Sequence, residues 1–227
     1  QTGKGVSDFH TGDRVVSNGN HAEYVVVNQN LCTRIPDNTD IKEASFTVLG
    51  SIALHGLRLS ETSLGSKVVV IGLGIIGQLV CRLAEAQGSE VIGIDPDTKR
   101  TDLSANFYTS VEEANMTNVD SVIITAATSS NEPIEVATKI ARNKAKIVVV
   151  GDIPLNISRN DFYYKELELV VSKSYGPGRY DKQYEILGKD YPIEYVRWTE
   201  NRNFEAFIKL LSQNQIHLLD LVTEEVS

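Results

Sequence analysis

The sequence predicts an α/β fold built on a doubly wound parallel sheet. Short apolar runs alternate with amphipathic helical segments between about residues 66 and 171, and a glycine-rich turn joins the first run to the first helix. An acidic residue closes the second apolar run. Strands that are apolar along their whole length are typical of parallel sheets, because helices cover both faces of such a sheet.

Composition limits the class of protein. The 227 residues are 41% hydrophobic and 23% charged, as in an ordinary globular protein. A formal charge of −8 argues against general nucleic-acid binding, and no apolar run approaches the roughly 18 residues of a membrane span. Cys32 and Cys81 form no C-x-x-C motif, so we expect reduced thiols and a cytoplasmic location. Because the chain starts without Met, we expect it to be a fragment of a longer protein.

The glycine-rich turn has the G-x-G-x-x-G spacing of dinucleotide-binding sites. It follows an apolar run at 68–71, precedes a helix, and contains Gly72, Gly74, Ile75, Ile76 and Gly77. The first glycine permits a tight turn, the second lets a diphosphate approach the backbone, and the third lets the helix pack closely on the sheet. Unpaired N–H groups at the helix N-terminus face the phosphates. The pattern therefore predicts a dinucleotide site in a Rossmann unit; the alternative is a unit that keeps its glycines for packing alone.

Asp95 ends the second apolar run, 23 positions after Gly72. This spacing is close to the roughly 20 positions expected for the acid that binds the ribose hydroxyls. A carboxylate there repels a 2′-phosphate, so we favour NAD over NADP. Lys99 and Arg100 weaken this preference, because they could line the adenosine side or attract a phosphate.

The remaining elements are assigned from periodicity and breakers. Before the turn we expect strands at 13–16 and 22–27 and a helix at 41–59 that Asp40 caps. After it we expect strands at 91–94, 120–125, 146–150 and 167–171, and helices at 98–105, 111–114, 132–142 and 158–165. From residue 172 the composition changes to an aromatic loop, a helix at 203–213 and strands at 218–226.

The whole chain resembles the medium-chain dehydrogenase/reductase superfamily. The matching stretches are Gly12-Asp-Arg-Val, His21-Ala-Glu-Tyr-Val, the helix from Ala44 to Gly56, Val148-Val-Val-Gly-Asp, and the tail at 216–222. A sharper likeness joins it to the dehydrogenase half of bacterial bi-domain oxidoreductases. That likeness rests on the stretches at 162–181 and 191–200, and it implies a second oxidoreductase domain or partner.

The resemblance implies a domain plan and a metal prediction. Residues 1–40 and 176–227 would belong to a GroES-like β-rich catalytic domain that lacks its N-terminal part, and residues 41–175 to the NAD-binding Rossmann domain. In zinc-dependent relatives, a Cys near the helix before the Rossmann domain is a metal ligand, but Leu49 stands near that position. Zinc needs about four N, S or O ligands, and the Cys and His residues here have no paired spacing. We therefore predict no zinc.

The resemblance also implies positions around the cofactor. Thr125 and Ala126 would lie near the nicotinamide ribose, and Ile94 and Pro96 would enclose the adenine. The residues expected beside the nicotinamide are Val150, Gly151 and Asp152; the valines of this strand also fit a plain β-core.

Three residues are candidates for catalysis. Tyr175 can donate to a carbonyl oxygen, and Arg179 can bind a carboxylate or phosphate; the alternative is a loop that packs on the N-terminal part of the catalytic domain that we expect to be missing here. His55 is an acid–base candidate on the helix before the Rossmann unit, and Ser51 lies one helical turn earlier. Both could instead serve packing.

These observations lead to three hypotheses for function. The first is a zinc-independent NAD(H)-dependent oxidoreductase that transfers hydride on an alcohol or carbonyl, with a sugar or polyol suggested by the resemblance. The second is an NAD-binding module without independent catalysis, and the third is an NADPH-dependent quinone or enone reductase, which Asp95 disfavours. We expect a small-molecule substrate, and a homodimer formed through the apolar edge strand at 167–171.

Overall fold

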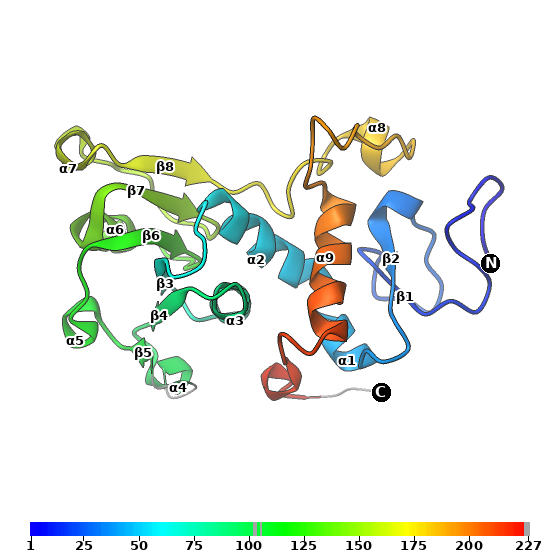
Figure 1. The fold of residues 1–227 in the computed structure, drawn as a ribbon, viewed down its shortest axis with the longest axis horizontal. Helices are drawn as coiled ribbons and strands as arrows, with labels where there is room; N and C mark the ends of the chain where they lie inside the picture. The colour runs from blue at the N-terminus through cyan, green and yellow to red at the C-terminus, as the bar shows by residue number, and fades with distance from the viewer. Residues whose placement is uncertain (102–103, 105, 225–227) are drawn as a thin grey trace. The chain divides into compact units, whose positions relative to one another are not determined.

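The computed structural model describes residues 1–101, 104 and 106–224 and consists of two compact units (Figure 1). Unit 1 comprises Gln1–Ser51 and Tyr175–Ser227, and unit 2 comprises Ile52–Ser174. The sequence placed the corresponding boundaries after residues 40 and 175.

Unit 2 is built on a parallel sheet in the order β5-β4-β3-β6-β7-β8. The strands are β3 (Lys67–Ile71), β4 (Glu90–Ile94), β5 (Phe107–Tyr108), β6 (Val119–Ile124), β7 (Ala141–Val149) and β8 (Glu168–Val171). The strand order reverses direction between β3 and β6, which makes the sheet doubly wound. The predicted fold class is confirmed.

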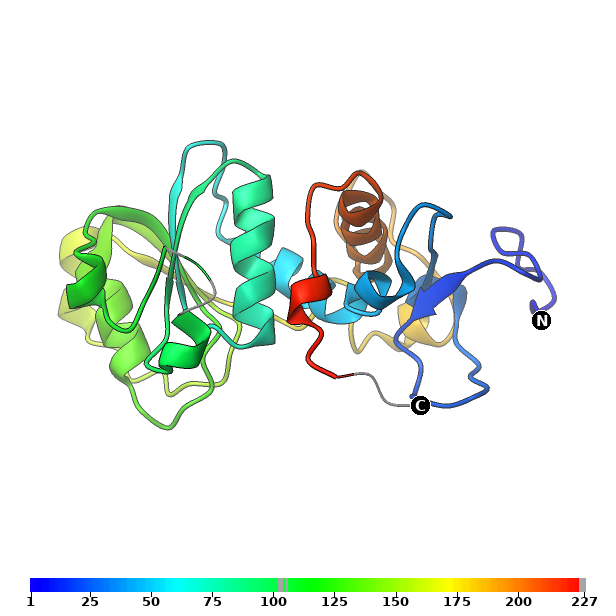
Figure 2. The same cartoon turned by 90° about the horizontal axis from the view of Figure 1, so that it is seen from below.

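Helices cover both faces of this sheet. They are α3 (Ile75–Ala86), α4 (Thr98–Thr101), α5 (Val111–Ala114), α6 (Glu132–Ile140) and α7 (Arg159–Lys165). In Figures 1 and 2, α3 lies on one face, and α6 and α7 lie on the other. The apolar runs supply the core between these layers: Val69, Val122, Ile124 and Ile147 are all fully buried. Burial on both faces explains why these strands are apolar throughout.

The register of the sheet brings the strand ends to one edge. Ile71 is paired with Ile94 on one side and with Ile124 on the other, and Ile124 is paired with Val149. The residues that follow β3, β4, β6 and β7 therefore emerge together at the carboxyl edge, where ligands bind in open α/β sheets.

Unit 1 packs short elements around one long helix. Strands β1 (Val15–Ser17) and β2 (Cys32–Arg34) are antiparallel. The helices are α1 (Ile41–Ala44), the start of α2 (Thr47–Leu59), α8 (Lys182–Glu185) and α9 (Glu200–Ser212), with 3-10 turns η1 (Gln29–Leu31) and η2 (Leu219–Leu221). Phe204, Phe207 and Leu211 form the buried face of α9, as the periodicity predicted. A side chain at Gly50 would lie 2.1 Å from the Phe207 ring, so only a glycine lets α2 pack this closely on α9.

Before the glycine turn, one predicted strand is wrong and one predicted helix is interrupted. The segment at 22–27 is not a strand: Tyr24 and Val26 are fully or almost fully exposed, and β1 is paired with β2 instead. The predicted helix at 41–59 is interrupted between α1 and α2. At the interruption, the Phe46 N–H donates to the Glu43 carbonyl three residues back, and the Thr47 hydroxyl donates to the Ala44 carbonyl.

Other elements differ at their ends. The predicted strands at 218–226 are wrong over residues 218–224, where i to i−3 hydrogen bonds form η2; residues 225 and 226 lie outside the described residues. Of the predicted helix at 98–105, the structure contains α4, which ends at Thr101. Residues 102, 103 and 105 lie outside the described residues. The sequence missed the two-residue strand β5 and the four-residue helix α8, which are too short to show periodicity.

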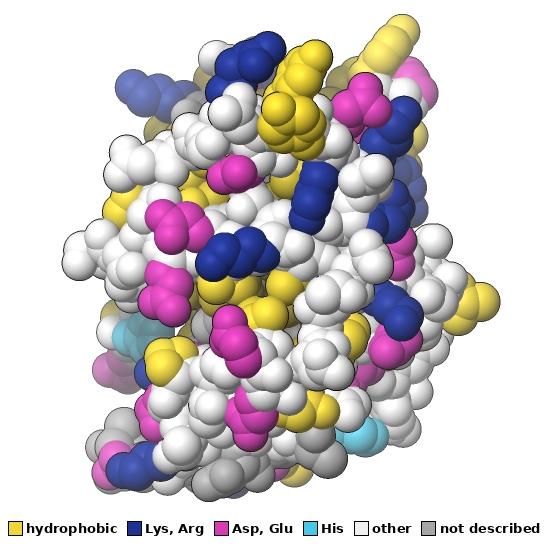
Figure 3. Space-filling view, turned by 90° about the vertical axis from the view of Figure 1, so that its left-hand side faces the viewer, with side chains coloured by type: hydrophobic (Ala, Val, Ile, Leu, Met, Phe, Trp, Pro, Cys, Tyr) yellow, Lys and Arg dark blue, Asp and Glu magenta, His cyan; other side chains and the backbone are white. Residues whose placement is uncertain are grey.

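The surface of unit 2 carries mixed charge. The face shown in Figure 3 has acidic and basic side chains interspersed, with apolar side chains scattered among them. In α7 and β8, Tyr163, Tyr164 and Val171 are all more than half exposed. No helix in the described part of the chain is long and apolar enough to cross a membrane.

Candidate functional site

The glycine turn has the geometry that its spacing predicts. Gly72 has φ +97°, in the left-handed region that favours glycine, and a side chain there would lie 2.6 Å from the Ala126 nitrogen. A side chain at Gly77 would lie 1.9 Å from the Gly72 carbonyl oxygen, so α3 can pack on the turn only without one. At Gly74 an added side chain would meet no atom within 4 Å. The space beside Gly74, at the start of α3, is therefore open.

Asp95 is buried and binds the turn directly. One carboxylate oxygen accepts from the Leu73 N–H at 2.7 Å and from Arg100 at 3.0 Å, and the other accepts from the Asp97 N–H at 2.9 Å. Burial tends to raise the pKa of Asp95, but these N–H groups and the Arg100 guanidinium outweigh it and hold the pKa below its ordinary value. The side chain is therefore a carboxylate at neutral pH.

The surroundings of Asp95 on the chain surface are polar. Pro96 and Arg100 are exposed, and Arg100 also reaches Asp97 at 3.5 Å. The resemblance placed Pro96 at the adenine, and the sequence left Arg100 either on the adenosine side or as a contact for a phosphate. Pro96 follows Asp95 directly and Arg100 lies in α4, and both roles stay predictions.

The residues after β6 and β7 lie at the same carboxyl edge of the sheet. The N–H groups of Thr125 and Ala126 both donate to the Ile71 carbonyl, at 2.8 and 3.1 Å. Val150 and Gly151 likewise donate to the Ile124 carbonyl, and a side chain at Gly151 would lie 2.0 Å from the Ala126 oxygen. Half-buried Ile76 and exposed Ile75 begin α3, and Asp152 is exposed next to Gly151. The residues predicted to bind the cofactor thus gather at one edge of unit 2, while their contacts with a cofactor stay predictions.

His55 and Ser51 lie on α2. His55 is half-buried, and burial together with the nearby Arg58 lowers the pKa of its imidazole. Its neutral form therefore dominates at pH 7, and this form can accept a proton. Ser51 is fully buried, and its hydroxyl donates to the Thr47 carbonyl at 2.7 Å, an ordinary helix contact.

Tyr175 and Arg179 lie in unit 1 within a polar cluster. The Tyr175 hydroxyl is buried and accepts from Asn18 at 3.0 Å, and burial raises the pKa of Tyr175. Arg179 forms an ion pair with Glu185 at 2.8 Å and lies 5.0 Å from the Tyr175 ring centroid. In the structure both side chains make contacts within unit 1. Their catalytic roles stay predictions.

Glu200 belongs to the same cluster, and sequence reasoning missed it. Its side chain is fully buried, and one carboxylate oxygen has no hydrogen-bond partner among the described residues. The other lies 3.4 Å from the Asn18 side-chain nitrogen. Burial first, and then the Glu185 charge, raise the pKa of Glu200 to about 8. An acid in the first turn of a helix ordinarily indicates favourable helix electrostatics, and nothing in the local sequence shows that this one is buried.

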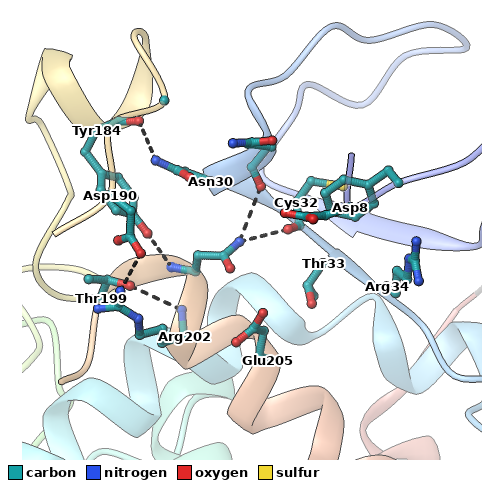
Figure 4. A pocket seen from close by; sticks show the side chains of 14 residues that line it. Asp8, Asn30, Cys32, Thr33, Arg34, Tyr184, Asp190, Thr199, Arg202 and Glu205 are labelled. Carbon is teal, nitrogen blue, oxygen red and sulfur yellow. Dashed lines mark hydrogen bonds and ion pairs between the residues drawn. The ribbon is translucent and has the colours of Figure 1, made fainter. Parts of the chain in front are cut away.

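A polar pocket of about 420 Å³ lies in unit 1, apart from the glycine turn in sequence and in unit (Figure 4). Asn201 on α9 lines the pocket, and its side chain donates to the Cys32 and Gln29 carbonyls at 2.8 and 3.4 Å. Arg202 is paired with Asp190, and the Glu205 carboxylate points into the pocket. None of the residues that the sequence singled out for a cofactor or for catalysis lines it.

The thiols are poorly disposed to bind metal. Cys32 and Cys81 are both buried and unpaired. Burial raises the pKa of Cys32 to about 11 and that of Cys81 further, whereas a metal ligand must be a thiolate. In the described part of the chain, no group of three or more His, Cys, Asp or Glu side chains comes together. The absence of zinc stays a prediction.

Comparison with known proteins identifies the class of relatives. The chain is 28% identical over 174 residues to 2-dehydro-3-deoxy-L-galactonate 5-dehydrogenase of Pseudoalteromonas atlantica, covering 68% of this chain and 49% of that protein. It is 35% identical over 108 residues to D-guloside 3-dehydrogenase of Escherichia coli, covering 46% of this chain and 31% of that protein. The expected resemblance to dehydrogenases is confirmed by these curated relatives. The narrower likeness to bi-domain oxidoreductases stays a prediction.

Solved structures agree on the fold. Galactitol-1-phosphate dehydrogenase from Escherichia coli has a TM-score of 0.75 at 21% identity, covering 96% of this chain and 72% of that one. For 2R,3R-butanediol dehydrogenase from Bacillus subtilis the TM-score is 0.73 at 20% identity, with coverage of 98% and 69%. At this identity the likeness concerns the fold alone.

A family comparison supports the cofactor class. Residues 49–161, just under half of the chain, match the family described as D-isomer specific 2-hydroxyacid dehydrogenase, NAD binding domain. This description differs from the names of the curated relatives, but both descriptions concern dehydrogenases. The chain spans about half or less of the length of the curated relatives described above.

Proposed function

We propose that this chain is the coenzyme-binding portion of an NAD(H)-dependent dehydrogenase that acts on an alcohol or carbonyl group of a sugar or polyol, without zinc. The observation that carries the proposal is the glycine turn of unit 2, with open space at Gly74 and an ionised Asp95 beside it. The names of the curated relatives support the substrate class.

The residues present fit a dinucleotide. The space that a side chain at Gly74 would enter is open, so a diphosphate can approach the backbone there. The first N–H groups of a helix have no carbonyl of an earlier turn to bond, so those of α3, which begins next to Gly74, are available to a diphosphate. When bound, the nicotinamide ring supplies or accepts the hydride. The chain's own part is to bind and orient the coenzyme along the carboxyl edge of the sheet.

The charge of Asp95 favours NAD over NADP. Its lowered pKa keeps it ionised, and an ionised carboxylate accepts ribose hydroxyls but repels a 2′-phosphate. Arg100 is half-exposed beside it and could attract such a phosphate if its bond to Asp95 were released. A zinc-binding dehydrogenase from Sinorhizobium meliloti with the same fold was solved with NADP, so NADP is the competing coenzyme. A third function, an NADPH-dependent quinone or enone reductase, is disfavoured by the same charge.

The proposal of zinc independence rests on Leu49 and on the two thiols. Leu49 stands near the position where the resemblance places a cysteine ligand, and both cysteines of the chain are buried with raised pKa values. Metal analysis tests this part separately. One tightly bound zinc ion per chain would contradict it and leave the coenzyme proposal intact.

Calorimetric titration with NADH and with NADPH tests the coenzyme proposal. We expect NADH to bind more tightly than NADPH. Binding without turnover of sugars or polyols, even in a longer protein that contains this chain, would favour the alternative function, an NAD-binding module that serves a fused or partner domain. If neither nucleotide binds, both functions fail.

The assembly of the protein is a further part of the proposal. The edge strand β8 and the neighbouring α7 expose Val171, Tyr163 and Tyr164, and an exposed strand edge favours pairing with another strand. We propose a homodimer through β8 and a second oxidoreductase domain or partner in the complete protein. A monomer in light scattering would contradict the homodimer.

A further inference from the structure

One peptide group of the glycine turn is held from both sides. The Gly72 carbonyl and the Leu73 N–H belong to the same planar peptide. The Thr125 hydroxyl donates to this carbonyl at 2.5 Å, and the N–H donates to Asp95 at 2.7 Å. Thr125 follows β6 and Asp95 follows β4, the two strands that flank β3. The peptide is thus fixed between its neighbouring strands.

The packing around the carbonyl leaves it little freedom. A side chain at Gly77 would lie 1.9 Å from the Gly72 oxygen and 2.9 Å from the Thr125 hydroxyl, so these three groups are in close contact. The Thr125 hydroxyl also lies 3.2 Å from the Ile71 carbonyl. Because a peptide is rigid, fixing its oxygen and its N–H fixes the direction in which the chain continues to Gly74 and α3.

We propose that Thr125 is a positioning residue, which together with Asp95 fixes the Gly72–Leu73 peptide and so aims the N-terminal N–H groups of α3 at the coenzyme diphosphate. This inference rests on the proposed function. The resemblance implied a position for Thr125 near the nicotinamide ribose. In the structure its hydroxyl is engaged by the turn instead, and the effect on the coenzyme is transmitted through the backbone.

Two substitutions at this position separate the roles of the hydroxyl. Thr125→Val keeps the shape of the side chain and removes the donor, and Thr125→Ser keeps the donor. We expect Thr125→Val to weaken the binding of both NADH and ADP to the 227-residue chain by about fivefold, the size of one net hydrogen bond. Thr125→Ser should bind both nucleotides nearly as tightly as the unaltered protein.

ADP is the decisive probe, because it has the diphosphate but lacks the nicotinamide ribose. A loss of NADH affinity with unchanged ADP affinity would show direct contact with the ribose and overturn the inference. Equal affinities in Thr125→Val and the unaltered protein would also overturn it. Thr138→Val is the matched control, since the Thr138 hydroxyl bonds a helix carbonyl at 2.8 Å in α6, on another element; we expect unchanged affinities.

Hydrogen exchange at the Leu73 amide gives a readout that needs no ligand. We expect faster exchange in Thr125→Val than in Thr125→Ser or the unaltered protein, because the peptide loses one of its two anchors. If the unaltered protein binds neither nucleotide, the proposed function fails, and the Leu73 exchange rate still decides whether Thr125 fixes the peptide. An unchanged rate would overturn that role.

Discussion

Asp95 has two tasks that one substitution can separate. Its carboxylate accepts the Leu73 N–H, and in the proposed function its negative charge repels a 2′-phosphate. Asp95→Asn removes the charge but keeps the shape. Asn keeps one acceptor oxygen, so any weakening of the Leu73 contact affects NADH and NADPH alike, whereas loss of repulsion helps NADPH alone. We therefore expect the ratio of the two dissociation constants to shift toward NADPH by about tenfold, measured by calorimetry.

Asp120 provides the matched control for this experiment. It also accepts a backbone N–H, from Lys67 at 2.8 Å, and an arginine, Arg142 at 2.6 Å, but it lies at the opposite end of the sheet. Asp120→Asn should lower stability without changing the coenzyme ratio. The same ratio shift in both variants would contradict the assignment of Asp95.

The raised pKa of Glu200 predicts that the stability of the folded chain depends on pH. Its pKa is about 8 in the folded chain, above the ordinary 4.5, so the unfolded chain releases this proton first as the pH rises. Stability contributed by the protonated acid is therefore present below pH 4.5 and is lost between about pH 4.5 and 8. Arg179 opposes this shift, while Glu185 adds to it.

Glu200→Gln tests this dependence, because an amide cannot ionise. We expect the melting temperature of the variant to exceed that of the unaltered protein at pH 8 by more than it does at pH 5. The measurement is thermal unfolding at both values, with exposed Glu112→Gln as the control that should show no such change. A difference in melting temperature that is the same at both pH values would exclude the buried acid as the cause.

At the scale of elements, one lysine joins α7 to the end of α6. The Lys165 ammonium donates to the carbonyls of Thr138, Lys139 and Ala141, at 2.7 to 2.9 Å. These are carbonyls that the end of a helix leaves without partners, and the positive charge also suits the helix C-terminus. Lys165→Met keeps the aliphatic stem and removes the donors. We expect unfolding in urea to show a loss of about 1–3 kcal/mol.

Lys144→Met is the control for that substitution. Lys144 is largely exposed, and its ion pair with Glu166 lies in solvent, so its removal should change stability by less than about 0.5 kcal/mol. Neither variant touches the glycine turn, and both should bind NADH unchanged. Equal losses of stability would show that Lys165 does not act through the helix end.

The elements that the sequence predicted are those whose signal is local. The glycine turn, α3 and Asp95 follow from spacing within one strand–helix–strand unit, and the structure brings the predicted cofactor residues to one edge. The segment at 22–27 failed because a strand requires a partner, which local composition does not report. Glu200 and the anchoring role of Thr125 depend on contacts between distant segments, and no periodic pattern encodes them.

At the scale of the whole molecule, each unit has its own core. The core of unit 2 gathers the strand residues around Val122, and that of unit 1 gathers around Phe204 and Tyr184. A chain with two separate cores can unfold in two steps. All residues of the glycine turn belong to unit 2, and Glu200 belongs to unit 1. A ligand at the glycine turn should therefore affect the unfolding step of unit 2, and a substitution at Glu200 the unfolding step of unit 1.

Calorimetric melting tests this division. We expect two transitions at pH 8. NADH at 100 times its dissociation constant should stabilise only the transition of unit 2, by about 2.7 kcal/mol, because it binds the folded form of that unit. Glu200→Gln should raise the other transition and leave the NADH response intact. A single transition that responds to both changes would show that the two cores unfold together, and the independence of the units would then be wrong.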